Sequence, residues 1–307
     1  MGGFESDRTK TEYRGQMIRT LPSTRIYKVG YNGFIIFYFF VLFAPLLVIS
    51  ILAFNDSLFP SLPWYGFTLD WFFGEGPEKI GIFNDARNLG GIFVSFKVAF
   101  WVTLFSTTVG TCAAFLFEHE EFRFKQFFYY AMIAPLVVPG VIIGISLLTF
   151  ATSLGTFLEN SVGIDVRLLS PGLFLVVCGQ SSFITTFVTL VIIARLKKFD
   201  RSLEEAAYNL GANRFEVIWY ITLPFLRPAV IGAAAVAFLL SFENFNTTLF
   251  LVGADATLPI TLFTQIKDGS TPVVNAVSLV LIIGVSTIAL VNFLVSLKSS
   301  KKNGGSA

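Results

Sequence analysis

The sequence predicts an all-α membrane protein with six transmembrane helices, and three observations lead to this fold class. Of the 307 residues, 54% are hydrophobic and only 14% are charged, and the mean hydropathy is +0.72. Soluble domains carry about 25% charged residues, so this composition lies outside their range. Six apolar stretches are long enough to cross a bilayer, and the basic residues gather in alternate connections between them.

Each predicted span is a long apolar run. A helix needs roughly 20 residues to cross a hydrocarbon core of about 30 Å, because each residue adds about 1.5 Å. The predicted spans are residues 33–54, 90–117, 127–150, 170–194, 228–251 and 275–297. Their backbone is expected to be helical, since unpaired amides in lipid cost several kcal/mol. Pro45, Pro135 and Pro139 lie inside spans and are expected to kink them.

The distribution of Lys and Arg predicts the orientation. One side of the six-span arrangement carries 17 of the 22 basic residues, spread over residues 1–32, 118–126, 195–227 and 298–307. The opposite connections carry four, and Lys97 lies inside a span. Cytoplasmic connections are enriched in Lys and Arg, so both termini are expected in the cytoplasm.

The connections have distinct compositions. Residues 55–89 contain Trp64, Tyr65 and Trp71 and suit the membrane interface. Residues 252–274 contain an amphipathic piece, Ile260–Ile266, which is expected to form a short interfacial or re-entrant helix. The short connection 118–126 holds four polar residues that are expected to be solvated: Glu118, His119, Glu120 and Glu121.

The sequence contains no motif for binding or hydrolysing a nucleotide. No GxxxxGK[ST] phosphate loop is present, so no nucleotide-binding domain is expected, and energy must come from a partner or a gradient. A single His argues against a membrane-embedded enzyme and against a metal site. We expect no cofactor and no nucleic-acid partner.

The longest polar connection, residues 200–228, reads as two short helices joined at Gly211. Ser202 with Glu205 and Asn213 with Glu216 fit capping boxes, and Gly211 suits a left-handed helix end. Ala206 and Ala207 are expected to form a small flat face, with apolar neighbours that a solvated loop would not expose. These neighbours are Leu203, Tyr208, Leu210, Phe215 and Trp219. Such a patch indicates a protein contact, and the alternative is an amphipathic hairpin on the inner leaflet.

This connection resembles a known motif. Glu205-Ala206-Ala207, then Gly211, then Ile221-Thr222-Leu223-Pro224, is similar to the EAA loop (EAA-x3-G-x9-I-x-LP) of type I, MetI-like ABC importer permeases. In that family the loop is the coupling helix that docks on the cytoplasmic ATPase. The resemblance therefore implies ATPase docking in the coupling loop 200–224 through Glu205, Ala206, Ala207, Gly211, Leu223 and Pro224.

The resemblance extends over a predicted permease core, residues 90–297. It implies an N-terminal cytoplasmic segment (1–32), an extra helix with its external loop (33–89) and a cytoplasmic tail (298–307). Three stretches resemble the spermidine/putrescine subgroup: residues 134–148, Ser241–Asn244 and residues 271–282. Val94 departs from the family, which usually has Asn at that position.

The resemblance also implies partners and a place in the cell. They are an ATPase dimer holding ATP and magnesium, a second permease that is a paralogue, an external or periplasmic binding protein, and the lipid of a bacterial inner membrane. The chain itself would not be an enzyme. Opine, aminoethylphosphonate, thiamine and ferric iron remain alternative solutes. A stand-alone secondary transporter is the other alternative, although no internal repeat is visible.

Glu243 is the side chain most suggestive of substrate contact. It is expected about 21 Å from the cytoplasmic edge of its span, where an acid is costly and by default functional. Asn244, Phe242 and Phe245 could add hydrogen bonds and ring faces for an ammonium group. The alternative is structural, because Lys97 is expected at a similar depth and could form an internal ion pair with Glu243.

Overall fold

The computed structural model describes residues 25–76, 79–164, 166–269 and 272–287. These residues form helices joined by turns, with two isolated β-bridges and no strand among them. Within these described ranges, five helices are long and apolar enough to cross a membrane: Tyr27–Leu52, Ala86–His119, Gly140–Val162, Leu173–Leu196 and Arg214–Phe242. The all-α membrane fold is confirmed, whereas the count of six spans is not.

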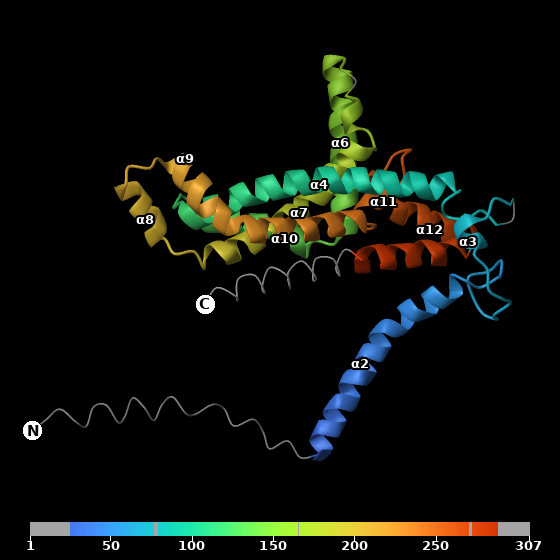
Figure 1. Ribbon diagram of the computed structural model, residues 1–307. Helices are drawn as coiled ribbons and strands as arrows, with labels where there is room; N and C mark the ends of the chain where they lie inside the picture. Colours follow the sequence, from blue (N-terminus) through green and yellow to red (C-terminus); the bar gives the residue numbers. More distant parts are fainter. Residues whose placement is uncertain (1–24, 77–78, 165, 270–271, 288–307) are drawn as a thin grey trace, which may run out of the picture.

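The bundle is built on three long helices that run side by side: α4 (Ala86–His119), α7 (Leu173–Leu196) and α10 (Leu223–Phe242) (Figure 1). Apolar side chains on facing surfaces fill the space between them. The core includes Val98 and Val102 of α4, Ile184 and Val188 of α7, and Ala237 of α10, all at most 1% exposed. These helices hold the two ends of the molecule apart.

The two ends carry different elements. At one end lie the short helices α8 (Ser202–Asn209) and α9 (Arg214–Val217), and a π-helix, η2 (Ile218–Thr222), leads into α10 (Figure 1). At the other end lie α3 (Asp70–Phe73) and α12 (Leu258–Gly269). We call these the α8 end and the α3 end. The helix expected within residues 252–274 is confirmed as α12.

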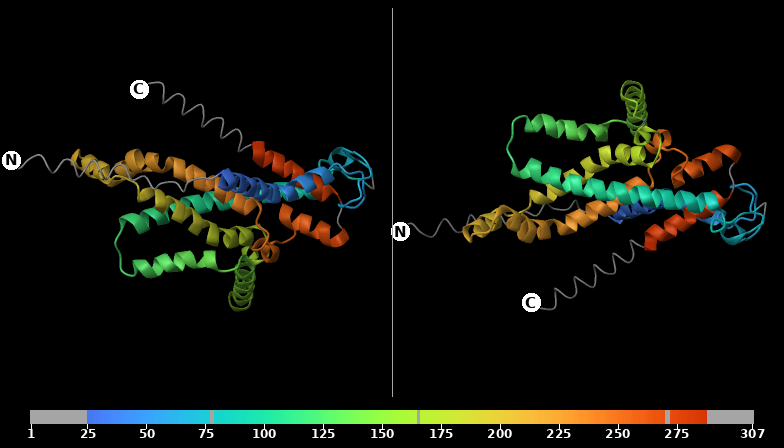
Figure 2. Two further views of the ribbon diagram at one scale, coloured as in Figure 1. Left: turned by 90° about the horizontal axis from the view of Figure 1, so that it is seen from below. Right: turned by 90° about the horizontal axis from the view of Figure 1, so that it is seen from above.

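The predicted span 127–150 is wrong as a single helix. Residues Lys125–Val137 form α5, and Gly140–Val162 form α6, which lies across the direction of the long helices in Figures 1 and 2. Pro139 has no backbone N–H to donate and restricts Val138 to an extended conformation, with ψ of 129°, so the helix ends there. Pro139 therefore separates helices α5 and α6, whereas Pro45 and Pro135 lie inside helices α2 and α5.

The predicted span 228–251 is also interrupted. Helix α10 ends at Phe242, and the short α11 (Thr248–Leu251) begins after a break of a few residues. Of the predicted span 275–297, the described part is helical as Val273–Thr287, and residues 288–297 lie outside the described residues. Helix α2 (Arg25–Leu52) diverges from the bundle (Figure 1), and no residue of its apolar stretch is buried.

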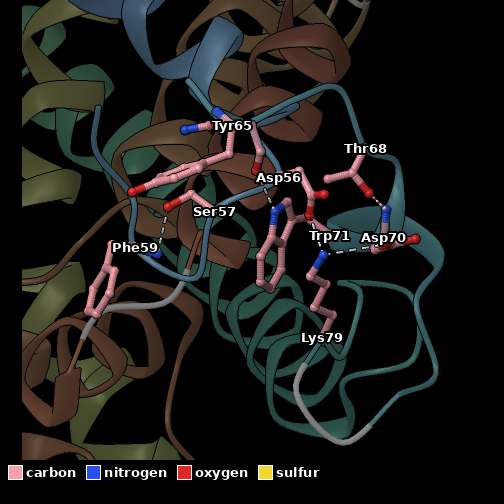
Figure 3. A network of polar contacts seen from close by, with 9 residues as sticks. Asp56, Ser57, Phe59, Tyr65, Thr68, Asp70, Trp71 and Lys79 are labelled. Carbon is pink, nitrogen blue, oxygen red and sulfur yellow. Dashed lines mark hydrogen bonds and ion pairs between the residues drawn. The ribbon is translucent and has the colours of Figure 1, made fainter. Parts of the chain in front are cut away.

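The connection between α2 and α4 folds into a cap over the α3 end. Trp71 is 2% exposed, and its indole N–H donates to the carbonyl of Asn55 at 2.8 Å, so this ring packs inside the cap. Lys79 pairs with Asp56 and Asp70 beside this ring (Figure 3). The hydrogen bond from Lys79 to Asp56 holds the pKa of that ammonium above its usual value.

Candidate functional site: a helical hairpin and a broken helix

The α8–α9 hairpin is the first candidate site, and its joint is set by local sequence. Gly211 has φ of +89°, the left-handed conformation predicted from sequence, and it ends α8 without a side-chain penalty. Asn213 and Glu216 form the predicted capping box, with hydrogen bonds of 3.0 and 2.8 Å. The other predicted box is wrong. Ser202 is the first helical residue, and its backbone N–H is accepted by Asp200 at 3.0 Å.

The hairpin exposes apolar side chains, as predicted. The exposed set comprises Leu203, Tyr208, Leu210, Phe215, Trp219 and Tyr220. Leu210 is 90% exposed, and Phe215 stacks on Trp219 with ring centroids 6.0 Å apart. The α8 end therefore exposes six large apolar or aromatic side chains.

The predicted docking residues divide between this surface and the interior. Glu205, Ala206, Gly211 and Pro224 are exposed, and Leu223 is half-buried. Ala207 is buried, because successive helical residues point about 100° apart and it faces the base of the hairpin. The prediction that Ala206 and Ala207 form a flat exposed face is therefore wrong, because, of these two residues, only Ala206 is available to a partner.

Ion pairs tie the hairpin to the turn between α4 and α5. Arg201 donates to the carbonyl of Glu118 at 2.9 Å and lies 3.4 Å from its carboxylate, and Arg214 pairs with Glu120. Glu118 and Glu120 are thus paired, which corrects the expectation of a purely solvated turn.

The break between α10 and α11 is the second candidate site. Buried Gln180 of α7 donates its amide N–H to the Thr248 hydroxyl at 2.8 Å and accepts from Ser241. The Thr248 hydroxyl donates to the Asn244 side chain at 3.0 Å. Ser241, Gln180 and Thr248 are each at most 3% exposed. This chain of side chains fixes a non-helical segment inside the protein.

The predicted substrate residues lie on this break. Glu243 caps the end of α10 with an exposed side chain, and it therefore does not sit within a continuous helix as predicted. Asn244 belongs to the Gln180 network. Phe242 stacks on Phe238 with centroids 6.0 Å apart, and Phe245 packs on Phe263 of α12 at 4.9 Å. The break thus presents an exposed carboxylate next in the chain to rings that pack on other aromatic side chains.

The sequence and fold match one family. The family model described as "Binding-protein-dependent transport system inner membrane component" matches residues 106–299. The chain belongs to this family. It is 30% identical to "Putrescine transport system permease protein PotI" of Escherichia coli (strain K12) over 86% of this chain and 89% of that protein. It is 27% identical to "Spermidine/putrescine transport system permease protein PotC" of Shigella flexneri, covering 89% and 96%.

A solved structure shares the fold. The crystal structure of a bacterial ABC transporter involved in the import of the acidic polysaccharide alginate superposes with a TM-score of 0.69 at 18% identity, covering 90% of this chain and 95% of that chain. This chain is accordingly an ABC importer permease, a multi-pass inner-membrane component that is not itself an enzyme. The family implies an ATPase, a second permease and a substrate-binding protein as partners.

The predicted ion pair between Lys97 and Glu243 is absent from the permease structure, and both side chains are exposed. Phe96 faces α10, where it contacts Phe238 with ring centroids 5.4 Å apart. Lys97 is turned about 100° from Phe96 and lines an apolar groove between α4 and α7. Lys97 therefore lies in the groove between α4 and α7, whereas Glu243 lies at the end of α10.

The sequence did not predict Gln180 of the permease as a site residue, and it indicated Ser241 only as part of the stretch Ser241–Asn244. Gln180 is the one amide side chain in α7, and it is completely buried. A buried amide must be hydrogen-bonded, so an isolated Gln inside a span is a signal for a polar partner on another helix.

Proposed function

We propose that this permease forms half of the translocation path of an ABC importer for polyamines such as putrescine and spermidine. The observation that carries the substrate class is the likeness to PotI and PotC over nearly the whole chain. The second permease is proposed to be a paralogue, so that the two chains form a heterodimer. The α8 end is proposed to face the cytoplasm, with both termini on that side.

The α8–α9 hairpin is proposed to dock on the ATPase. Its exposed apolar surface around Leu210 suits burial in a groove, and Glu205, Ala206 and Gly211 lie at the same tip. Closure of an ATPase dimer would draw two such hairpins together, one from each permease. The capping box of Asn213 and Glu216 fixes the start of α9 within this hairpin.

The break after α10 is proposed to contact the substrate. An exposed carboxylate attracts an ammonium group, and no cation of the described residues pairs with Glu243. Asn244 adds an amide, and Phe242 and Phe245 offer aromatic surface on either side of Glu243. A diamine could meet this carboxylate as it leaves the external binding protein.

Uptake of radiolabelled putrescine and spermidine by proteoliposomes holding the complete importer tests the proposal. The variant Glu243→Gln keeps size and hydrogen bonding but removes the charge. Its initial uptake rate at low substrate should fall about tenfold, since hydrogen bonds to charged groups contribute about 1.5–3 kcal/mol. Glu121→Gln, a change at a carboxylate that is 89% exposed at the α8 end, should leave uptake unchanged.

Two results would contradict the proposal in different ways. If the wild-type importer accumulates neither amine but does accumulate an opine, aminoethylphosphonate, thiamine or ferric iron, the polyamine assignment is wrong. If both amines enter and Glu243→Gln imports them at the wild-type rate, the substrate role of Glu243 is wrong while the assignment holds.

A further inference from the structure

Glu204 differs from its neighbours on α8 because its side chain turns into the protein. It precedes the exposed Glu205, yet its own side chain is only 12% exposed. Its carboxylate accepts a hydrogen bond from the Thr222 hydroxyl at 2.6 Å. The same oxygen lies 3.5 Å from Nε2 of His119. One carboxylate thus meets two other elements.

The two contacts join α8 to separate parts of the bundle. Thr222 is completely buried and ends the π-helix η2, from which α10 continues into the core. His119 is the last residue of α4. Its side chain is 19% exposed, so the predicted solvated position is wrong. Both ring nitrogens are buried, and neither makes a hydrogen bond within the described residues, while Nε2 lies within ion-pair distance of the Glu204 carboxylate.

The other polar contacts at the α8 end connect the hairpin to the bundle less strongly than the hydrogen bond between Glu204 and Thr222. Arg201 and Arg214 are 58% and 66% exposed in their pairs with Glu118 and Glu120, and exposed ion pairs contribute little. A cavity of 580 Å³ lies between α4, α8 and α9 and is lined by His119 and Glu204. Apolar packing therefore does not fill this space. A short hydrogen bond between a carboxylate and a buried hydroxyl is a stronger link.

The hydrogen bond between Glu204 and Thr222 lies at the π-helix η2, which connects the hairpin to α10. π-Helical turns inside α-helices are rare and often mark functional sites. Here the turn Ile218–Thr222 separates α9 from α10, and its last residue is the one that Glu204 holds. The hydrogen bond from Thr222 to Glu204 therefore connects α8 directly to the start of α10, so that a displacement of α8 can reach α10 without passing through the π-helical turn.

We propose that Glu204 is a positioning residue that transfers displacement of α8 to α10 through Thr222 and to α4 through His119. The inference depends on the proposed docking of the α8–α9 hairpin on an ATPase. Glu205 and Ala206 would then meet the ATPase on the outer face of α8, while Glu204 passes the motion on from the inner face.

The matched pair Thr222→Val and Thr222→Ser tests this transfer in the complete importer. Valine has the same shape as threonine but cannot donate to Glu204, whereas serine keeps the hydroxyl. The readout is putrescine imported per ATP hydrolysed in proteoliposomes, with the amount of copurified ATPase measured for each variant. For Thr222→Val we expect this ratio to fall at least about fivefold with normal ATPase content. Thr222→Ser should stay near the wild-type ratio.

Three results would overturn the transfer role. The first is a wild-type ratio in Thr222→Val, and the second is an equal loss in Thr222→Ser. The third is loss of the copurified ATPase in Thr222→Val, which would assign the contact to docking. A wild-type chain that copurifies no ATPase would instead overturn the docking proposal itself, and with it this inference.

Discussion

Gly144 lies where α6 crosses the break between α10 and α11, and its missing side chain sets the distance between them. A Cβ atom at this position would lie 2.7 Å from the backbone carbonyl oxygen of Thr247. That oxygen belongs to the segment that the Gln180 network holds in place, so it cannot move aside freely. At this position the close approach of two backbones, and no special φ angle, requires glycine.

The substitution Gly144→Ala should therefore destabilise the permease by about 1–3 kcal/mol through overpacking. Gly232→Ala is the matched control, because Gly232 lies in α10 with nothing within 4 Å of its added Cβ. Alanine in a helix is favoured over glycine by roughly 0.5–1 kcal/mol, so this control should be neutral or stabilising. Thermal unfolding in detergent measures both. Equal melting temperatures for the two variants would show that the crossing is not tightly packed.

Among the elements, the α8–α9 hairpin was the most predictable from sequence because its signals are local. Gly211, Asn213 and Glu216 act within a few residues of one another, and each has the predicted conformation or contact. Ser202 was misassigned as a cap because Asp200, two residues earlier, accepts the N–H that begins the helix. Competing caps at adjacent positions cannot be ranked from sequence alone.

The interrupted helices could not be predicted in the same way. The break after Phe242 depends on Gln180, which lies 61 residues from Ser241 and 68 from Thr248 in the chain. Apolar periodicity reports only local preference, so a single polar residue in a distant helix does not alter it. The break at Pro139 carried a local signal, but proline inside a span allows either a kink or an end.

A charge placed on the exposed apolar surface of the α8–α9 hairpin tests whether the hairpin docks on the ATPase. Leu210→Glu places a charge on a side chain that is 90% exposed, so folding should be unaffected. In an apolar groove of a partner the charge would have to be desolvated, and copurification of the ATPase should fall at least about tenfold. The control is Leu62→Glu, the same change at a residue that is 74% exposed at the α3 end. Equal ATPase recovery from both variants would contradict docking at the hairpin.

For the whole molecule, the two ends of the bundle differ in charge in a way that predicts its orientation. Connections at the α8 end, residues 118–126 and 195–227, carry eight Lys and Arg residues. The connections at the α3 end carry four: Lys79, Arg87, Arg167 and Lys267. Basic connections are retained in the cytoplasm, so the α8 end should lie inside, where ATP is available to a partner. The docking proposal and the charge distribution thus require the same orientation.

Labelling with a membrane-impermeant maleimide measures this orientation. Cys112 and Cys178 are both exposed in the isolated chain and would first be replaced by serine. A cysteine introduced by Asp268→Cys, in α12 at the α3 end, should react in intact spheroplasts. One introduced by Glu121→Cys, at the α8 end, should react only after the membrane is permeabilised. The reverse pattern would place the hairpin outside the cell, where no ATPase could dock, and the coupling mechanism proposed for Glu204 would fail with it.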